Sequence, residues 1–210
     1  MKPDSWDELK EKSHPYIKLM SYYKCAMMEI ETKFNVLNEE FSLQHDRNPI
    51  SSIKGRLKSP GSIVNKIRKK DLSYNLETVA EHVPDVAGVR VCCAFIEDVY
   101  MLADALLNQD DVTLIERKDY IASPKSNGYR SLHLIVEIPI FLANEKRKMK
   151  VEIQLRTIAM DFWASLEHQL RYKKDFEFTQ AMADELLSCA ELSAALDRKM
   201  DALRDQVLNF

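Results

Sequence analysis

The stretch KMKVEIQLR, residues 148–156, decides the fold because its apolar and polar side chains alternate without interruption. One face carries Met149, Val151, Ile153 and Leu155, and the other carries Lys148, Lys150, Glu152, Gln154 and Arg156. Such alternation predicts a strand with one buried and one polar face. Thr157 follows as a candidate N-cap for a helix whose apolar residues are Ile158, Phe162, Trp163, Leu166 and Leu170.

Three other segments also have the composition of strands. Residues 86–95, VAGVRVCCAF, are β-branched and apolar, and residues 112–116 and 132–138 follow them. Helices are predicted near residues 62–70 and 98–107. Helices that flank a sheet of about four or five strands indicate an α+β domain.

Both ends of the chain are predicted to be long helices, because their apolar residues recur at alternating steps of four and three. The first seam is Tyr16, Met20, Tyr23, Met27, Ile30, Phe34, Leu37 and Phe41. The second is Met182, Leu186, Cys189, Ser193, Leu196, Met200, Leu203 and Val207. Two interpretations stay open: each seam packs on the chain's own core, or it forms a helical subunit interface.

Length and composition fit one domain, with N-terminal helices over residues 1–46, a core over 47–172 and a C-terminal helix over 173–210. No run approaches the roughly 18 apolar residues of a membrane helix. The charged N-terminus, MKPDSWDELKEK, argues against export. The four cysteines have no metal-site spacing. We therefore expect reduced cysteines, a cytoplasmic location and no membrane partner.

Residues 47–70 form a basic block with eight Lys or Arg side chains and no acid, although the whole chain has a net charge of −3. Gly55, Gly61 and Ser62 place flexible backbone and a helix start beside these cations. A helix N-terminus in a positive field suits phosphate groups. The alternative is a charged face that is merely solvated.

Four polar residues fall at corresponding places on the predicted strands. If their faces coincide, the sheet presents one cleft lined by Arg90, His133, Glu152 and Gln154. The alternative is a solvated outer face. Asp85, at the entrance of the Arg90 strand, forms a candidate Mg²⁺ pair with Glu152, since magnesium takes one or two carboxylates plus substrate phosphates.

The stretch YIASPKSNGYRSLHLIV, residues 120–136, contains a turn at Asn127-Gly128. Around the turn stand Lys125, Tyr129, Arg130 and His133. We interpret this stretch as a hairpin connection that also holds a ligand.

Four segments resemble, in order, the motifs of the (p)ppGpp synthetases of the RelA/SpoT family: GRLKSPGSIVNKI, PDVAGVRVCCAF, RKDYIASPKSNGYRSLHL and VEIQLRTIAMDFWASLEH. The match covers about residues 47–172. The N-terminal helix that ends in FSLQHDRNPI is similar to the RelP-type branch of the small alarmone synthetases. The resemblance implies a nucleotidyltransferase-like synthetase fold, a mixed sheet of about five strands flanked by helices, and a homo-oligomer, a tetramer in the small members, through the terminal helices.

The resemblance also implies an activity, that of a GTP diphosphokinase in stringent-response signalling. Such an enzyme transfers the pyrophosphate of ATP to the 3′-OH of GDP or GTP and releases AMP. Because the chain has no room for a hydrolase domain, synthesis only is expected. Mg²⁺ is the implied cofactor, with Asp85 and Glu152 as its ligands and Glu152 as the base on the 3′-OH.

The family's motifs imply further roles. The implied catalytic residues are Glu152, Asp85, Arg56 and Lys66. ATP would be bound by Arg56, Lys58, Ser62, Lys66, Lys69 and Arg90, the last stacking on adenine. The guanosine nucleotide would be held by Lys118, Lys125, Tyr129, Arg130, His133, Gln154 and Asp161, with Tyr129 stacking on guanine and Lys118 and Arg130 neutralising phosphate charge.

The charged segment Glu116-Arg117-Lys118-Asp119 mixes two patterns of the family, so the preferred guanine nucleotide stays open. One rival function is pyrophosphorylation of the tRNA 3′ end by the same fold. Another is a non-catalytic RNA- or nucleotide-binding module. Asp85 and Glu152 argue against this module, because a binder of polyanions gains nothing from two acids in its cleft. We expect no stable nucleic-acid partner.

Overall fold

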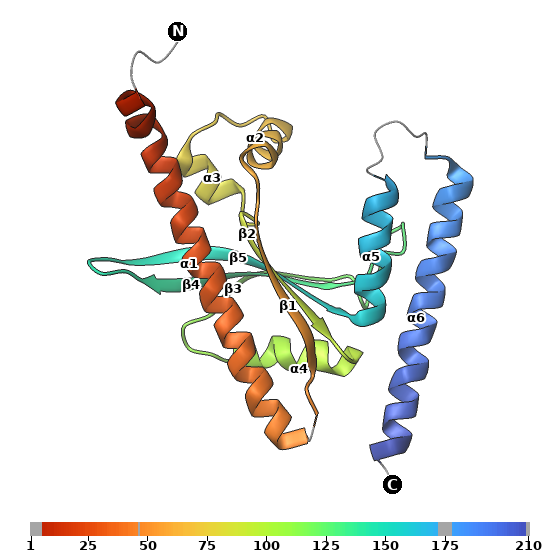
Figure 1. Ribbon diagram of the computed structural model, residues 1–210. Helices are drawn as coiled ribbons and strands as arrows, with labels where there is room; N and C mark the ends of the chain where they lie inside the picture. Colours follow the sequence, from red (N-terminus) through yellow and green to blue (C-terminus); the bar gives the residue numbers. More distant parts are fainter. Residues whose placement is uncertain (1–5, 46, 172–177, 209–210) are drawn as a thin grey trace.

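The computed structural model describes residues 6–45, 47–171 and 178–208 (Figure 1). In chain order the elements are α1 (Trp6–His45), β1 (Ile50–Leu57), α2 (Pro60–Lys69), α3 (Leu76–His82), β2 (Ala87–Cys93), α4 (Ile96–Leu107), β3 (Thr113–Asp119), β4 (Leu132–Phe141), β5 (Lys146–Thr157), α5 (Ile158–Arg171) and α6 (Gln180–Leu208).

The strands form one five-stranded sheet in the order β1-β2-β5-β4-β3. Strand β2 is parallel to β5, and the other neighbours are antiparallel. This confirms the predicted α+β fold with a mixed sheet. The alternating stretch at residues 148–156 lies in β5, the central strand, and its four predicted apolar residues are buried.

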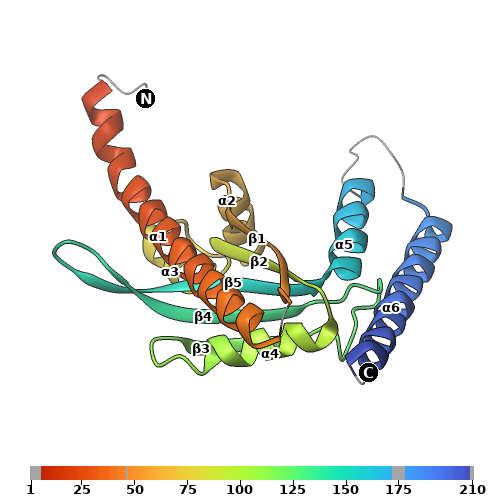
Figure 2. The same ribbon diagram turned by 60° about the horizontal axis from the view of Figure 1, so that its bottom comes forward.

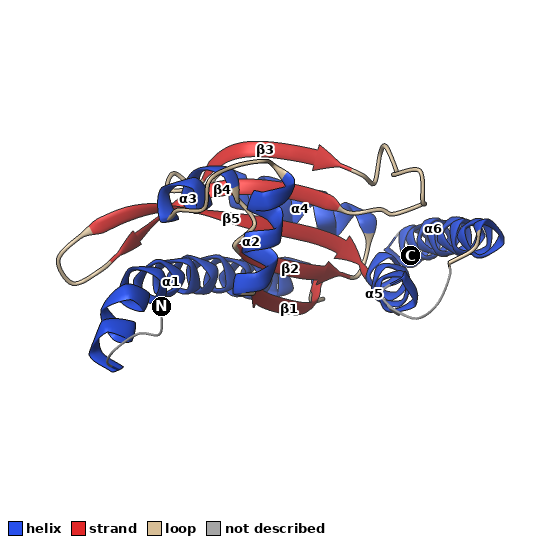
Figure 3. Cartoon of the chain, turned by 90° about the horizontal axis from the view of Figure 1, so that it is seen from above, coloured by secondary structure: helices blue, strands red, loops and turns tan. Residues whose placement is uncertain are grey.

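The apolar face of the sheet is covered by α1 and α4. In Figure 3, α2 and α3 lie in front of the strands and α4 lies behind them. Ile30 and Phe34 of α1, Leu102 of α4 and Ile153 of β5 belong to one core cluster and are each fully buried. On the other face, α2 and α3 lie toward one end of the sheet and α5 toward the other (Figure 1).

The two terminal seams have different outcomes. The α1 seam packs on the chain's own core, where Tyr23, Ile30 and Phe34 are at most 1% exposed. The α6 seam is open, since Leu196 is 55% and Leu203 is 53% exposed. Helices α5 and α6 lie side by side (Figures 1 and 2), and Trp163 donates its indole N–H to the Leu186 carbonyl at 2.8 Å.

Within the ranges that the structure describes, no helix has both the length and the apolar character that crossing a membrane requires.

Three predicted helix starts can be compared with the structure. Thr157 caps α5, because its Oγ1 accepts a hydrogen bond from the Met160 amide at 3.1 Å. The helix expected from residue 62 begins at Pro60, after the N-cap Ser59. The C-terminal helix expected from residue 173 begins at Gln180, and residues 172–177 lie outside the described ranges.

The sequence patterns did not single out β1 or α3. Strand β1 lies at the sheet edge, and its sequence, ISSIKGRL, has no regular alternation of apolar and polar residues. Gly55 allows α1 to approach this strand closely, because a Cβ at that position would lie 2.7 Å from the sulfur of Met27. Strand β1 is therefore defined by its pairing with β2 and its contact with α1, which periodicity does not reveal.

Replacing Phe34 with alanine should destabilise the protein by about 3–5 kcal/mol, because it empties a fully buried position between α1 and the sheet. Chemical denaturation followed by circular dichroism measures this loss. The matched control is Val36→Ala, since Val36 is 60% exposed on the same helix. Equal losses in the two variants would contradict the packing of α1.

Candidate active site

Two pockets lie on the open face of the sheet. The basic pocket has a volume of about 330 Å³ and is lined by Lys54, Gly55, Arg56, Lys58, Asp85, Gly88, Val89, Arg90, Glu152 and Gln154. The loop pocket, of about 210 Å³, is lined by Glu116, Lys118, Tyr120, Lys125, His133, Ile135 and Glu152. Glu152 lines both, so one carboxylate stands where the two pockets meet.

The strand register brings the predicted polar residues together. Gln154 of β5 is paired with Arg90 of β2 on one side and with His133 of β4 on the other. Glu152 is paired in the same way with Gly88 and Ile135. Paired residues share a face of the sheet. The structure therefore places the four predicted residues on one face of the sheet, where Arg90, Glu152 and Gln154 line the basic pocket and His133 and Glu152 line the loop pocket.

Asp85 is held between two lysines at the edge of the basic pocket. Its Oδ2 lies 2.8 Å from Nζ of Lys58 and 2.8 Å from Nζ of Lys66. Burial raises the pKa of Asp85, but the hydrogen bonds from both lysines outweigh it, so the pKa lies below its ordinary value. The other oxygen, Oδ1, is buried without a hydrogen-bond partner.

Three residues predicted to bind ATP, Ser62, Lys66 and Lys69, do not line the basic pocket. Ser62 belongs to the first turn of α2, where its amide donates to Oγ of Ser59 at 3.3 Å. Lys69 is exposed in the last turn of the same helix. Lys66 reaches the pocket through its ion pair with Asp85. The roles of Ser62 and Lys69 stay predictions.

The loop between β3 and β4 is shaped by local hydrogen bonds. The Gly128 amide donates to the Lys125 carbonyl at 2.8 Å, and the Tyr129 amide donates to Oδ1 of Asn127 at 3.2 Å. Gly128 has a φ of 85°, which favours glycine. The turn places Nζ of Lys125 4.5 Å from the ring centre of Tyr120 and 4.8 Å from that of Tyr129.

Arg130 lies apart from the other residues predicted to bind the guanosine nucleotide. Its Nη1 donates to the Ala190 carbonyl of α6 at 3.2 Å and to the Gly128 carbonyl at 3.4 Å. A Cβ added to Gly128 would lie only 2.5 Å from Cβ of Ala190. Gly128 and Arg130 thus dock the loop on α6, and a phosphate contact by Arg130 stays a prediction.

A closed ring of polar contacts connects Glu152 with four other side chains. Gln154 donates to Glu152 at 3.0 Å and accepts from Arg156 at 2.8 Å. Arg156 also donates to the Tyr129 hydroxyl at 2.7 Å. This hydroxyl lies 2.8 Å from Nε2 of His133, whose Nδ1 lies 3.5 Å from Glu152.

A guanidinium can only donate, so the Tyr129 oxygen accepts from Arg156 and its proton is free to be donated to Nε2 of His133. In the tautomer in which Nε2 accepts this proton, Nδ1 carries the ring proton and faces Glu152. Burial raises the pKa of Glu152, but the hydrogen bonds from His133 and Gln154 bring it below its ordinary value. Glu152 is therefore a carboxylate that can accept a proton.

The chemistry of the donors fits a Mg²⁺ ion bound together with phosphates. No cluster of three or more His, Cys, Asp and Glu side chains with metal-binding geometry occurs among the described residues. Asp85 and Glu152 both line the basic pocket, and the charge of Asp85 acts to raise the pKa of Glu152. Two carboxylates, one with a buried unpartnered oxygen, suit an ion whose other ligands are water and substrate phosphates.

Three residues that the sequence analysis did not select belong to the site. Lys54 lines the basic pocket and Tyr120 lines the loop pocket. Arg156 is the third, and it contacts the side chains of Tyr129, Gln154 and Asp161. The alternation of residues 148–156 already placed Arg156 on the face of Glu152 and Gln154, and that signal could have found it.

A larger cavity, of about 480 Å³, lies between α5 and α6 and contains none of the predicted site residues. Its lining is mostly apolar: Leu170, Phe178, Ala181, Met182, Glu185, Leu186 and Cys189. Such a lining has few groups that could neutralise phosphate charge. The two polar pockets are therefore the candidate active site.

Comparison with known proteins shows the family of the chain. Residues 55–177 match a family described as a region found in RelA / SpoT proteins. The GTP pyrophosphokinase YwaC of Bacillus subtilis is 43% identical over 201 residues, which cover 96% of each chain.

Two solved structures from Bacillus subtilis are also similar. That of small alarmone synthetase 2 has a TM-score of 0.83 and 42% identity, over 91% of this chain and 98% of the other. That of small alarmone synthetase 1 bound to its product pppGpp has a TM-score of 0.83 and 32% identity, over 92% and 98%. The chain therefore belongs to the RelA/SpoT family, in the group of small alarmone synthetases.

Proposed function

We propose that the protein transfers the β,γ-pyrophosphate of ATP to the ribose 3′-OH of GDP or GTP and releases AMP. The observation that carries this proposal is the position of Glu152, which lines both the basic pocket and the loop pocket. A base shared by two nucleotide pockets can reach a hydroxyl of one substrate while it faces the phosphates of the other.

The basic pocket suits ATP. Lys54, Arg56, Lys58 and Arg90 bring four cations to one cavity, where they would neutralise the charge that spreads over the transferred group. The guanidinium of Arg90 is planar, as stacking on adenine requires. The guanosine nucleotide would occupy the loop pocket, near Lys118, Lys125 and His133.

In the reaction, the 3′-oxygen forms a bond to the β-phosphorus of ATP. The bond between that phosphorus and the oxygen bridging to the α-phosphate breaks, and AMP leaves. The proton of the 3′-OH passes to Glu152. The hydrogen bonds from His133 and Gln154 lower the pKa of Glu152 and so keep its side chain ionised before the reaction.

Mg²⁺ is the proposed cofactor, and Asp85 and Glu152 would hold it. When bound, it supplies positive charge beside the phosphate oxygens. Lys58 and Lys66 both contact Asp85 and would neutralise the phosphates beside the ion. The four cysteines are free, in keeping with the prediction of a cytoplasmic location.

Purified protein incubated with ATP, Mg²⁺ and either GDP or GTP should form one AMP for each 3′-pyrophosphorylated nucleotide. Anion-exchange chromatography separates the products, and excess chelator should abolish both. A parallel incubation of labelled ATP with bulk tRNA tests the rival acceptor. If AMP and label appear only with tRNA, or if no guanine nucleotide reacts, the proposed function is wrong.

Replacing Glu152 with glutamine should lower kcat by about 10²–10⁴-fold, because the amide cannot accept the proton. Steady-state kinetics with both substrates measures this loss. Glu137→Gln is the matched control, because Glu137 lies on the neighbouring strand β4, is paired with Lys150 and lines neither pocket. Full activity in Glu152→Gln would exclude the role as a base.

We also propose that the chain forms a homo-oligomer, a tetramer, through its terminal helices. The support comes from α6, whose outer side leaves large apolar residues exposed: Leu192, Leu196, Met200, Leu203 and Val207. Helix α5 adds Ile158, Phe162, Leu166 and Leu170. The α1 seam cannot contribute, since it is buried in the chain's own core. Association of the α6 faces would remove this apolar surface from water.

The double substitution Leu196→Glu and Leu203→Glu should lower the mass in solution, because it places charges in the apolar interface. Multi-angle light scattering measures the change, and a wild-type tetramer has four times the chain mass of 24.4 kDa. Phe141→Glu, at an exposed apolar residue of β4, is the control. A wild-type mass of 24.4 kDa would sink the proposal.

A further inference from the structure

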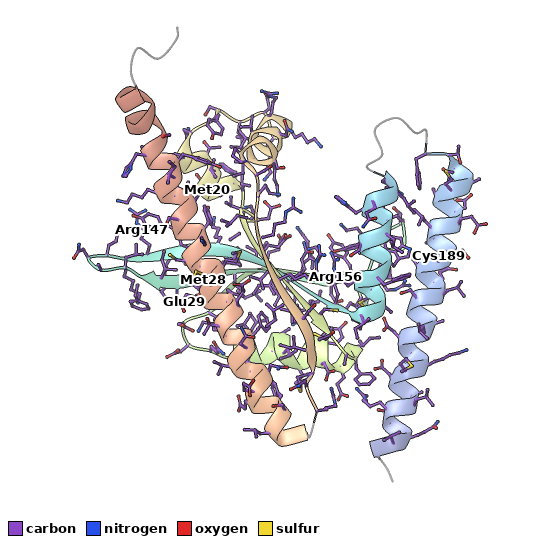
Figure 4. All side chains as sticks on the ribbon, viewed as in Figure 1. Met20, Met28, Glu29, Arg147, Arg156 and Cys189 are labelled. Carbon is purple, nitrogen blue, oxygen red and sulfur yellow. The ribbon has the colours of Figure 1, made fainter. Side chains whose placement is uncertain are left out.

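Arg156 is a buried charged residue that takes no part in the proposed reaction as described above. It lies near the end of the central strand β5, between the sheet and α5 (Figure 4), and is only 4% exposed. Burying a guanidinium carries a large desolvation cost, and apolar residues of similar volume commonly replace buried ion pairs without loss of stability. Its presence calls for a function beyond packing.

The contacts of Arg156 are made to three different side chains. One nitrogen, Nη2, donates to the Tyr129 hydroxyl at 2.7 Å and to Oε1 of Gln154 at 2.8 Å. The other, Nη1, donates to Oδ1 of Asp161 at 3.1 Å. The guanidinium carbon also lies 5.2 Å from the ring centre of Tyr129. Both the hydroxyl and the ring of this tyrosine are thus in contact with Arg156.

Neutralising Asp161 does not explain these contacts. Oδ1 of Asp161 already has a cationic partner in Arg90, whose Nη1 lies 3.2 Å away. A second cation solely for charge balance would not need to donate to a neutral hydroxyl and a neutral amide. The planar fork of Arg156 instead fixes two side chains relative to each other, which a point charge such as an ammonium cannot do.

We propose that Arg156 is a positioning residue, which orients Tyr129 for the guanosine nucleotide and Gln154 beside the base Glu152. This inference rests on the proposed function. In the ring of contacts, Tyr129 contacts His133, which faces Glu152, and Gln154 contacts Glu152 directly. Arg156 therefore holds both side chains through which the ring reaches the base. On the ATP side, Arg90 has its own ion pair with Asp161, and no contact of Arg156 is made to Lys54, Arg56 or Lys58 among the hydrogen bonds of the described residues.

The test replaces Arg156 with lysine, which keeps the charge but loses the fork, and with methionine, which also loses the charge. In both variants kcat should fall by about 10–100-fold, the size of effect expected when reacting groups are misplaced by an ångström. The KM for GDP should rise by about tenfold, while the KM for ATP should change less than about threefold. The matched control is Arg204→Lys. Arg204 of α6 forms an ion pair with Glu97 and lines neither pocket, so this variant should change none of these values.

A purely structural role predicts a different result. Loss of packing alone would lower the unfolding midpoint or the fraction of active protein and would affect both substrates alike. The inference is overturned if Arg156→Lys keeps wild-type kcat and KM for GDP, or if the KM values for ATP and GDP rise together.

Tyr129→Phe provides a second, independent measurement. It removes the hydroxyl that Arg156 contacts. The fold-loss of kcat in the double variant should therefore be smaller than the product of the fold-losses in Tyr129→Phe and Arg156→Lys. Multiplying losses would show that the contact has no functional effect. Calorimetric affinity for GDP separates this inference from the proposed function, because the weakening in Arg156→Lys is measurable without turnover.

Discussion

The structure depends on the register of the central strand β5, which pairs with β2 along one edge and with β4 along the other. Its odd-numbered residues from Met149 to Leu155 enter the core, and Glu152 and Gln154, on the opposite face, line the pockets. Because side chains alternate, a slip of one residue would bury Glu152 and expose Ile153. The apolar core and the candidate active site are therefore fixed by the same hydrogen-bonded pairing.

Charge in the site follows a common arrangement, in which one carboxylate serves two cations. Asp85 contacts Lys58 and Lys66, and Asp161 contacts Arg90 and Arg156. Each group of three keeps a net positive charge while its partly buried carboxylate remains compensated. A surplus of cations suits a polyphosphate substrate, since the donors are in place before the charge of the transition state develops.

Helix α6 lies beyond the matched family region, residues 55–177, yet it supports the site. Ala190 fits against Gly128, whose backbone conformation and missing side chain allow the contact, and its carbonyl holds Arg130. Thr157, which caps α5, also donates its hydroxyl to Asp197 of α6 at 2.7 Å. The outer side of α6 is apolar and open. Helix α6 thus contacts the loop between β3 and β4 on one side and carries the proposed subunit interface on the other.

The sequence by itself determined the faces of β5, the cap at Thr157, the basic block and most residues of the two pockets, because these follow from local periodicity, composition and family motifs. Only the tertiary structure decided that Glu152 stands between the pockets, that Arg130 turns to α6, and that the α1 seam is covered while the α6 seam is open. It also revealed β1 and the contacts of Arg156. Periodicity tells which residues share a face, whereas the element that meets this face is chosen by packing between residues far apart in the chain.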